Sequence, residues 1–336
     1  MTTTVIVATS PLPKDNFFRL WGLVLVAMLV LGGIGIKTIS PILLSLLAQA
    51  MIEAIFATSL GVLHRHNGRV SFGHAAFYGL AAYLATLLFK QTQIPGWVAV
   101  LLALALPSAL GFVIGLVIAR IPGVAHAMLT LVVGQALFEV AFKWRQVTNG
   151  DDGLTVAMPQ SLFGIQTDLF QMPAVMFVVA TCILLLILFG LAILARTHFG
   201  ALTEAIRDNP ERARFIGYGT TLPCAIVYAI SAAIAAVAGV LFITYNTFVT
   251  PAVLHWTTSG TALVMAIIGG PRILWGPAIG ALAFFFLKDL VSDVSTLWPA
   301  IVGTVLIVVT LTMPDGIAGL IVGAMERLRS LPRTKR

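Results

Sequence analysis

The chain has 336 residues, of which 59% are hydrophobic and only 10% charged, and its mean hydropathy is +1.01. Soluble domains average about 25% charged residues, so this composition excludes a soluble enzyme, a nucleic-acid-binding module and a secreted domain. At roughly 20 residues per crossing, the apolar content is enough for on the order of ten helical spans. The sequence therefore predicts an all-α, polytopic membrane protein with a single transmembrane domain over residues 1–336.

Apolar stretches long enough to cross a bilayer recur along the chain. Three weaker stretches, at 71–89, 255–270 and 275–291, contain glycine, proline or polar residues, and the first two of them either cross the membrane or re-enter it. The total is therefore eight to ten spans. The clearest stretches are 17–36, 41–63, 97–119, 123–142, 172–195, 222–243 and 297–312.

The distribution of Lys and Arg predicts how the spans are oriented. With ten crossings, fifteen basic residues fall on the side of both termini and four on the opposite side, with Lys288 near the end of a span. Because cytoplasmic loops are enriched in Lys and Arg, both termini are predicted to be cytoplasmic. The cytoplasmic parts are then the tail 1–16, the loop 196–221 and the basic tail 324–336, and the longest opposite loop is 143–171.

No motif for catalysis, a metal or a resident cofactor is found in the sequence. There is no HExxH and no CxxC pair, and the glycine-rich run 32–38 lacks the glycine that precedes the lysine of a Walker motif. Cys182 and Cys224 lie in or beside apolar runs, which favours helix packing over a disulfide or a metal site. We expect neither an enzyme nor a metalloprotein, and any ATP must be bound by another chain.

The loop 196–221 is strongly charged, and its residues predict two short helices. The first covers 201–208, with apolar residues four positions apart on one face. The second has Asn209 as its N-cap and Glu211 in its first turn, and it ends at Gly217. Such capped, charged helices between two spans suit docking into the groove of a partner. A solvated connector whose arginines only fix topology is the alternative.

Within the second helix, the apolar residues Ala213, Phe215 and Ile216 are expected to form one side. The charged residues of the helix are expected to face away from that side.

The stretch 68–83 is rich in small residues, including Gly73 and Gly79. Helices of this composition pack backbone to backbone or leave room beside a pathway. Ser71 and His74 are polar residues near its start, and His74 is expected near the cytoplasmic surface. His74 is interpreted either as a hydrogen-bonded residue between helices or as a contact for a solute.

Three ionisable residues, Glu53, Glu139 and His126, lie within otherwise apolar stretches. Such residues are expected to face the bundle interior or water. They serve either structural hydrogen bonding or the proton coupling that a secondary transporter would need.

Residues 211–217 resemble the E-A-A-x-x-x-G loop of bacterial ABC-importer permeases, with Arg212 in place of the first alanine. The longer run 199–217 resembles one branch of them, the larger (M-type) permease subunit of branched-chain amino acid importers. The resemblance implies an ATPase-coupling loop formed by Gly200, Glu204, Ala205, Arg207, Asn209, Glu211, Ala213 and Gly217.

Three further blocks resemble the same family. Residues 68–83 resemble its G-x-x-S-x-G-H-A-A-F-x-G-x-G-A-Y, 269–280 its G-G-x-G-S-L-W-G-P-x-x-G, and 313–320 its R-P-x-G-L-x-G-L. The blocks occur in the family's order and extend over about 40–323, nearly the whole chain.

The resemblance implies a multi-pass permease of the bacterial inner membrane that imports branched-chain amino acids or a related small polar solute. ATP and Mg²⁺ would be bound by two cytoplasmic ATPase subunits, and no cofactor by this chain. A second homologous permease subunit would complete the pore within the lipid bilayer, and a periplasmic substrate-binding protein would deliver the solute. No nucleic acid is expected as a partner.

The stretch 148–154 resembles the family's T-G-G-x-x-G-[LI], in which Gly150 and Gly153 permit a tight outer turn. At Gln135 and Asn149 the family more often has glutamate and glycine. Close relatives carry urea, short amides, or aromatic and other carboxylates, and these solutes are the alternatives within the class.

Two functions of other classes remain open at this point. An ion-coupled secondary transporter would depend on intramembrane charges such as Glu53 and Glu139 and would need no ATPase. A membrane scaffold would not transport a solute.

Overall fold

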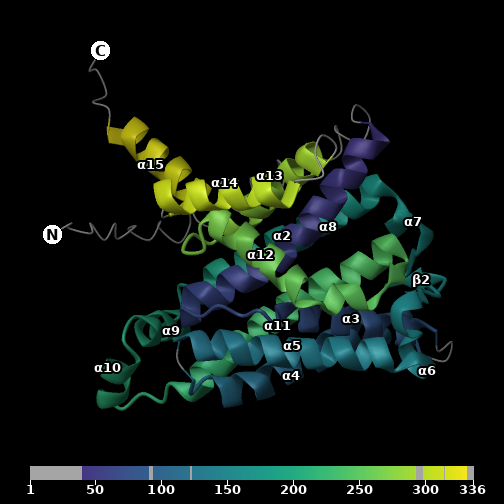
Figure 1. Cartoon of the computed structure of the whole chain (residues 1–336), viewed down its shortest axis with the longest axis horizontal. Coiled ribbons are helices and arrows are strands. Elements are labelled where there is room, and N and C mark those ends of the chain that lie inside the picture. The colour runs from purple at the N-terminus through teal and green to yellow at the C-terminus, as the bar shows by residue number, and fades with distance from the viewer. Residues whose placement is uncertain (1–39, 91–93, 122, 293–297, 314, 331–336) are drawn as a thin grey trace.

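Figure 1 shows the computed structural model, in which the described part of the chain is largely helical. This confirms the predicted all-α class. The predicted first span at 17–36 and the tail 1–16 lie outside the described residues, as do residues 331–336 of the C-terminal tail. The structure describes residues 40–90, 94–121, 123–292, 298–313 and 315–330.

The helices and strands follow one another as listed here by residue range. The longer helices are α2 (Pro41–Asn67), α3 (His74–Phe89), α4 (Gly96–Ile118), α5 (Gly123–Lys143), α8 (Pro173–Leu194), α9 (His198–Asp208), α11 (Thr221–Asn246), α12 (Trp256–Gly269), α13 (Gly276–Ser292), α14 (Trp298–Thr312) and α15 (Gly316–Ser330). The short elements are α6 (Arg145–Thr148), α7 (Asp168–Gln171), α10 (Pro210–Phe215), the 3-10 turns η1 (Gly150–Asp152) and η2 (Pro251–Leu254), and the strands β1 (Leu154–Thr155), β2 (Ser161–Leu162), β3 (Ile165–Gln166) and β4 (Phe248–Val249).

Five described helices, α2, α4, α5, α8 and α11, are long and apolar enough to cross a membrane. They coincide with five of the clear stretches in the sequence. Helices α14 and α15 meet at a bend of 46° and together would make a sixth span. The chain is therefore a multi-pass membrane protein, while the total of ten crossings stays a prediction.

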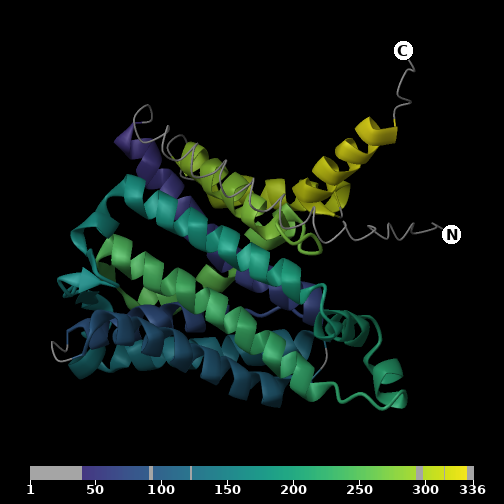
Figure 2. The same ribbon diagram turned by 180° about the vertical axis from the view of Figure 1, so that it is seen from behind.

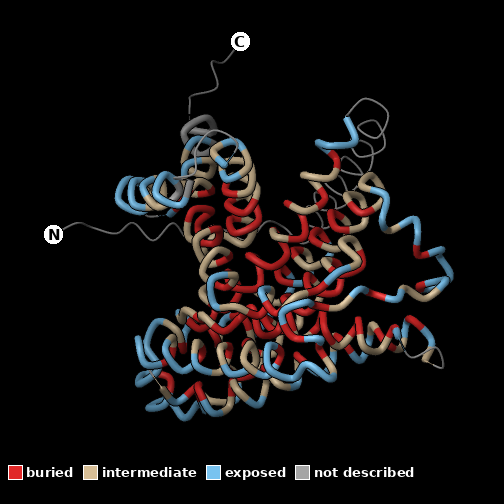
Figure 3. Tube along the Cα trace, turned by 45° about the vertical axis from the view of Figure 1, so that its right-hand side comes forward, coloured by how far each residue is buried: buried red, intermediate tan, exposed pale blue. Residues whose placement is uncertain are grey.

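The helices form layers, with α4 and α5 on one side, α3 and α11 next, then α2 and α8, and α13 to α15 on the far side (Figures 1 and 2). Buried residues concentrate in the middle layers (Figure 3), because α2 and α11 are mostly enclosed while α4 and α5 expose apolar side chains. Helices α4 and α11 approach closely at Gly111 and Gly115, where added Cβ atoms would lie 2.5 Å and 2.9 Å from Ala232 and Ala225. This small-xxx-small spacing is typical of tight helix pairs in membranes.

Helices α3 and α12 have 16 and 14 residues, so each is about 24 or 21 Å long. That is shorter than the hydrocarbon core of about 30 Å. Their first turns meet inside the bundle, where the Ala75 backbone N donates to Ser259 Oγ at 2.7 Å. The non-helical α2–α3 connection (68–73) leads into α3, and a non-helical stretch around η2 leads into α12. The weak stretches at 71–89 and 255–270 are thus helices too short to cross alone.

The bundle has two distinct ends (Figure 1). The charged helices α9 and α10 lie at one, here called the α9–α10 end. The short strands lie at the other, here called the strand end, where β1 pairs with β4 and β2 pairs with β3, both antiparallel.

Candidate functional site

Helix α9 contains the helix predicted over 201–208 and begins one turn earlier. The Thr197 hydroxyl caps it by accepting a hydrogen bond from the Gly200 backbone N at 3.1 Å. A Cβ at Gly200 would lie 2.3 Å from the Leu194 carbonyl oxygen, so α9 packs on the end of α8 as closely as glycine allows. On the outer face of α9, Ala205 is exposed.

Three polar contacts join α9 to the last turn of α2. Arg65 Nε lies 3.2 Å from Glu204 Oε1, and both side chains are partly exposed. His66 Nδ1 and Thr203 Oγ1 lie 2.8 Å apart, and both residues are buried. Arg207 Nη1 donates to the Arg65 carbonyl oxygen at 2.6 Å. A displacement of α9 would therefore be transmitted directly to α2.

The N-cap predicted for the second helix is present. Asn209 Oδ1 accepts a hydrogen bond from the Arg212 backbone N at 2.8 Å, which begins α10. Ala213 is buried in a small cluster with Ala119 and Cys224, at the ends of α4 and α11. Helix α10 is thus attached to the bundle by this small apolar side chain and by Arg214, whose Nε donates to Thr220 Oγ1 at 3.2 Å.

The prediction that Ala213, Phe215 and Ile216 form one side of the helix is wrong, since Ala213 is buried. Phe215 is 91% exposed and Ile216 is 69% exposed. Residues two positions apart in a helix are rotated by about 200° about its axis. The side chain of Phe215 therefore points outward when Ala213 is buried. The exposed residues form a mixed charged and apolar surface, here called the α10 tip. Its members are Glu211, Arg212, Phe215, Ile216 and Tyr218.

The α2–α3 connection is held by neighbouring helices. Arg69 donates to the carbonyl oxygens of Ile118 and Ala119, at 3.1 and 2.8 Å, where α4 ends. The Phe72 backbone N donates to Thr130 Oγ1 of α5 at 3.2 Å. Non-helical backbone is tolerated at membrane depth only where it is buried in protein or lines water, and the bond from Phe72 satisfies one backbone group of the connection.

Two separate sets of hydrogen bonds lie between the start of α3 and the neighbouring helices. Ser71 Oγ lies 3.1 Å from Tyr228 OH, and His74 Nε2 lies 2.6 Å from Ser231 Oγ. Ser231 in turn donates to the Ser59 carbonyl oxygen of α2 at 2.5 Å. The expectation that His74 lies near the surface is wrong. His74 is fully buried, and its partner Ser231 lies about 15 Å along α11 from the first residue of that helix. His74 reaches this depth because the connection extends inward before α3 begins.

Gly73 and Gly79 both serve close packing in this structure. A Cβ at Gly73 would lie 2.1 Å from the Thr130 carbonyl oxygen, and one at Gly79 would lie 2.6 Å from the Leu254 side chain. These glycines bring α5 and η2 against α3.

Glu53 and Glu139 look alike in the sequence, but the structure gives them different surroundings. Glu139 lies on the surface of α5, is 44% exposed, and pairs with Lys143 at 3.0 Å. Glu53 lines a cavity of about 40 Å³ between α2, α11 and α13, together with Gln49 and Asn246. Of the two carboxylates, that of Glu53 lies at a small, partly polar cavity in the bundle, and that of Glu139 lies at the surface.

At the strand end, Gly150 and Gly153 form the tight turn that the sequence predicts. Both have positive φ, +60° and +70°, and Asn149 Nδ2 donates to the Gly153 carbonyl oxygen at 3.0 Å. A Cβ at Gly153 would lie 2.5 Å from the Val249 carbonyl oxygen, where β1 pairs with β4. The turn therefore ties the loop 143–171 to the end of α11.

Sequence reasoning missed the partners of the predicted residues. The cluster of His64, Arg65 and His66 at the end of α2 was the available signal, because charged residues in the last turn of a span are candidates for contacts with a loop. Tyr228 and Ser231 gave no signal, since nothing in the sequence shows which face of α11 they occupy. Within the described ranges, no group of three His, Cys, Asp or Glu residues could hold a metal ion.

The fold and this site define an all-α, multi-pass membrane protein with a polar interior and a charged two-helix loop at one end. A family model described as the permease component of branched-chain amino acid transport systems matches residues 42–311. The chain belongs to this family and is a permease subunit of an ABC importer.

Individual relatives agree with the family. The high-affinity branched-chain amino acid transport system permease protein LivM of Salmonella typhimurium is 24% identical over 289 residues, which cover 80% of this chain and 68% of the relative. LivM of Escherichia coli K12 is 24% identical over 88% of this chain and 74% of its own length. The permease protein LivH of the same strain is 26% identical over 79% of this chain and 91% of its own length. No solved structure matches the chain significantly.

Proposed function

We propose that this permease imports branched-chain amino acids or a closely related small polar solute, driven by ATP hydrolysis in partner subunits. The similar proteins LivM and LivH are named for branched-chain amino acid transport, which supports this solute class over urea, amides or other carboxylates. The chain itself binds neither ATP nor Mg²⁺ in this proposal, and it contributes no enzymatic step.

The α9–α10 end faces the cytoplasm of a bacterial cell, and the strand end faces the periplasm. The excess of Lys and Arg in the cytoplasmic loops supports this orientation, with both termini inside and about ten spans in the inner membrane. A second, homologous permease subunit forms the other half of the pathway. A periplasmic substrate-binding protein docks at the strand end.

The observation that carries the mechanism is the contrast between the exposed α10 tip and the bonded face of α9. Phe215 is 91% exposed at the tip, while α9 is bonded to α2 through Arg65 and His66. Two cytoplasmic ATPases bind the tip, and their closure on ATP displaces α9. The displacement passes to α2 and, through the α2–α3 connection, to the interior bonds of His74 and Ser71.

This account assigns a coupling role to the whole loop. Gly200 and Ala213 pack the loop against the bundle. Glu204 and Arg207 bind α2, and Glu211 lies at the docking surface. Ala205 lies on the outer face of α9. Asn209 and Gly217 set the direction of α10, the first as its N-cap and the second with φ +94° directly after it.

The test is purification of the tagged chain from its native host in mild detergent, followed by mass spectrometry of the associated proteins. The proposal predicts two ATPase subunits and a second permease. A matched Phe215→Asp chain should retain the second permease and lose the ATPases. A chain that purifies alone and still restores solute uptake would contradict the proposal.

A further inference from the structure

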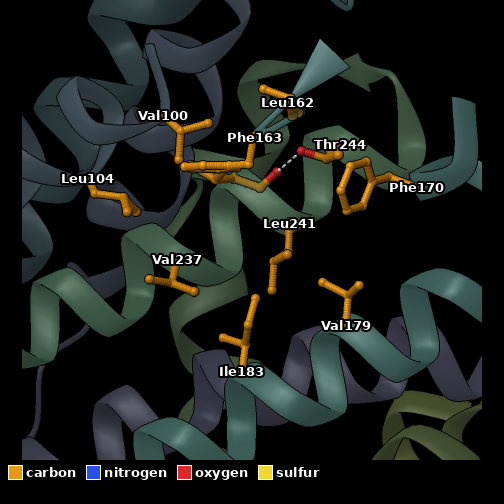
Figure 4. Close-up of a pocket in the computed structure, with 11 residues that line it drawn as sticks. Val100, Leu104, Leu162, Phe163, Phe170, Val179, Ile183, Val237, Leu241 and Thr244 are labelled. Atoms are coloured by element: carbon orange, nitrogen blue, oxygen red, sulfur yellow. Dashed lines mark hydrogen bonds between the residues drawn. The ribbon is translucent and has the colours of Figure 1, made fainter. Parts of the chain in front are cut away.

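A cavity of about 330 Å³ lies between α4, α8 and α11 near the strand end (Figure 4). Val100 and Leu104 line it from α4, Ile183 from α8, and Val237 and Leu241 from α11. The β2–β3 hairpin closes one side of it. The cavity is separate from the coupling loop and from the polar interior described above.

The lining offers no free polar group to a ligand. Its one polar side chain is Thr244, whose hydroxyl donates to the Val240 carbonyl oxygen of its own helix at 2.7 Å (dashed in Figure 4). A polar solute would lose its hydration here without gaining a hydrogen bond, and water needs several polar partners to occupy a cavity. The occupant must therefore be apolar.

The hairpin is built to place an aromatic ring at this cavity. Phe163 and Gly164 form its two-residue turn and both have positive φ, +54° and +82°. A bulky residue rarely adopts this conformation, and the two-residue hairpin turn, which needs positive φ at both positions, imposes it on Phe163 although the residue is 65% exposed. Its ring lies beside Val100 at the edge of the cavity (Figure 4), and the neighbouring Leu162 is buried.

The depth of the cavity fits one leaflet of the bilayer. Trp97, half exposed at the start of α4, is the kind of residue found at membrane interfaces. Val100 and Leu104 lie about 5 and 10 Å further along the same helix. Near the cavity, Leu101 and Leu186 are exposed apolar residues on α4 and α8, as expected for helices that contact lipid. Acyl chains are thus the apolar molecules present at this depth.

We propose that this cavity binds one acyl chain of a phospholipid from the leaflet at the strand end. An empty cavity of this size forfeits the dispersion contacts that close packing provides, and an acyl chain restores them. One turn of a transmembrane helix, 10–12 Å across and 5.4 Å long, occupies about 420–610 Å³, more than the roughly 330 Å³ of the cavity. The bound chain connects α8 to α4 and α11 beneath the hairpin.

The experiment uses the full chain with its copurified subunits in vesicles of phosphatidylethanolamine and phosphatidylglycerol. A phosphatidylethanolamine with a photoreactive diazirine in its acyl chain is included, and the adducts are located by mass spectrometry. The proposal predicts adducts concentrated on lining residues such as Val237 and Leu104, well above those on the lipid-facing Leu101.

Matched variants of α8 sharpen the test. Ile183→Trp fills the cavity and should reduce the adducts on Val237 several-fold, whereas Leu186→Trp, on the exposed face of the same helix, should not. Adducts spread evenly over lining and lipid-facing residues of the unaltered protein would overturn the proposal. A photoreactive amino acid at position 183 that captures residues 1–39 or a partner subunit instead of lipid would also overturn it.

Discussion

Helices α9 and α10 are neighbours in one loop, but they relate to the bundle in opposite ways. Helix α9 buries Thr203 and Ile206 and makes three polar contacts with α2, whereas α10 buries Ala213 alone and directs Phe215 outward. A loop that transmits motion from a partner subunit must be fixed to the bundle on one side and exposed to that partner on the other. The loop combines both properties because a short non-helical turn at Asn209 lets its two helices point in different directions.

The largest effect on solute uptake is expected at Gly217, which follows α10 and sets the direction of the chain there. Gly217 has φ +94°, which proline, fixed near −65°, cannot adopt. Gly217→Pro should abolish solute uptake and ATPase binding while the chain still inserts in the membrane. Gly219→Ala is the matched control, since Gly219 lies two residues away with open space around it and no positive φ. Normal uptake by the Gly217 variant would refute the role of the tip.

The next effect concerns the docking surface itself. Phe215→Asp should weaken ATPase binding by about 30-fold or more, since removal of an aromatic anchor from an interface costs about 2 kcal/mol or more. Because the side chain is exposed, thermal stability should not change. Binding of the ATPases is measured by copurification, and Phe215→Leu should retain most of it. Unaltered binding with Asp would show that the tip is a solvated connector.

On the α9 side, the expected effect is on stability and coupling. Thr203→Val removes the hydrogen-bond partner of buried His66 Nδ1 and should destabilise the protein by about 1–3 kcal/mol. The melting temperature should fall, and uptake should fall while ATPase binding is retained. Ala205→Val makes the same β-branched side chain on the exposed face of α9 and should leave the melting temperature unchanged. Equal melting temperatures in the two variants would contradict this reading.

The smallest effect is expected at the partly exposed pair of Arg65 and Glu204. Such pairs contribute about 0.2–1 kcal/mol, and salt screens them. Reversing either charge alone should lower uptake modestly, and the double exchange Arg65→Glu with Glu204→Arg should restore it. A double-mutant cycle on uptake measures the coupling, and additive losses would place the two residues in independent roles.

Much of the fold could be predicted because the spans are long and uniform. Runs such as 41–63 and 172–195 correspond closely to α2 and α8, and the capping residue Asn209 located α10. How deep in the membrane α3 begins could not be predicted. Hydropathy does not indicate that residues 68–73 turn back into the bundle as non-helical backbone.

The candidate site was predicted less completely. Glu204 could be placed in the coupling loop, but its partner Arg65 is 139 positions away, and no local pattern connects them. In the same way, Glu53 and Glu139 could not be separated, because both helices are apolar around their whole circumference and give no sign of which face is enclosed. Only the packing of α2 between α11 and α13 distinguishes them.

The central claim is that the α10 tip receives the motion of the ATPases and α9 passes it to α2. The most direct test is the ratio of solute transported to ATP hydrolysed, measured in vesicles that contain the Glu204→Arg chain and its partner subunits. The account predicts retained ATP hydrolysis and a lower ratio, restored when Arg65→Glu is added. A ratio equal to that of the unaltered protein would contradict the claim.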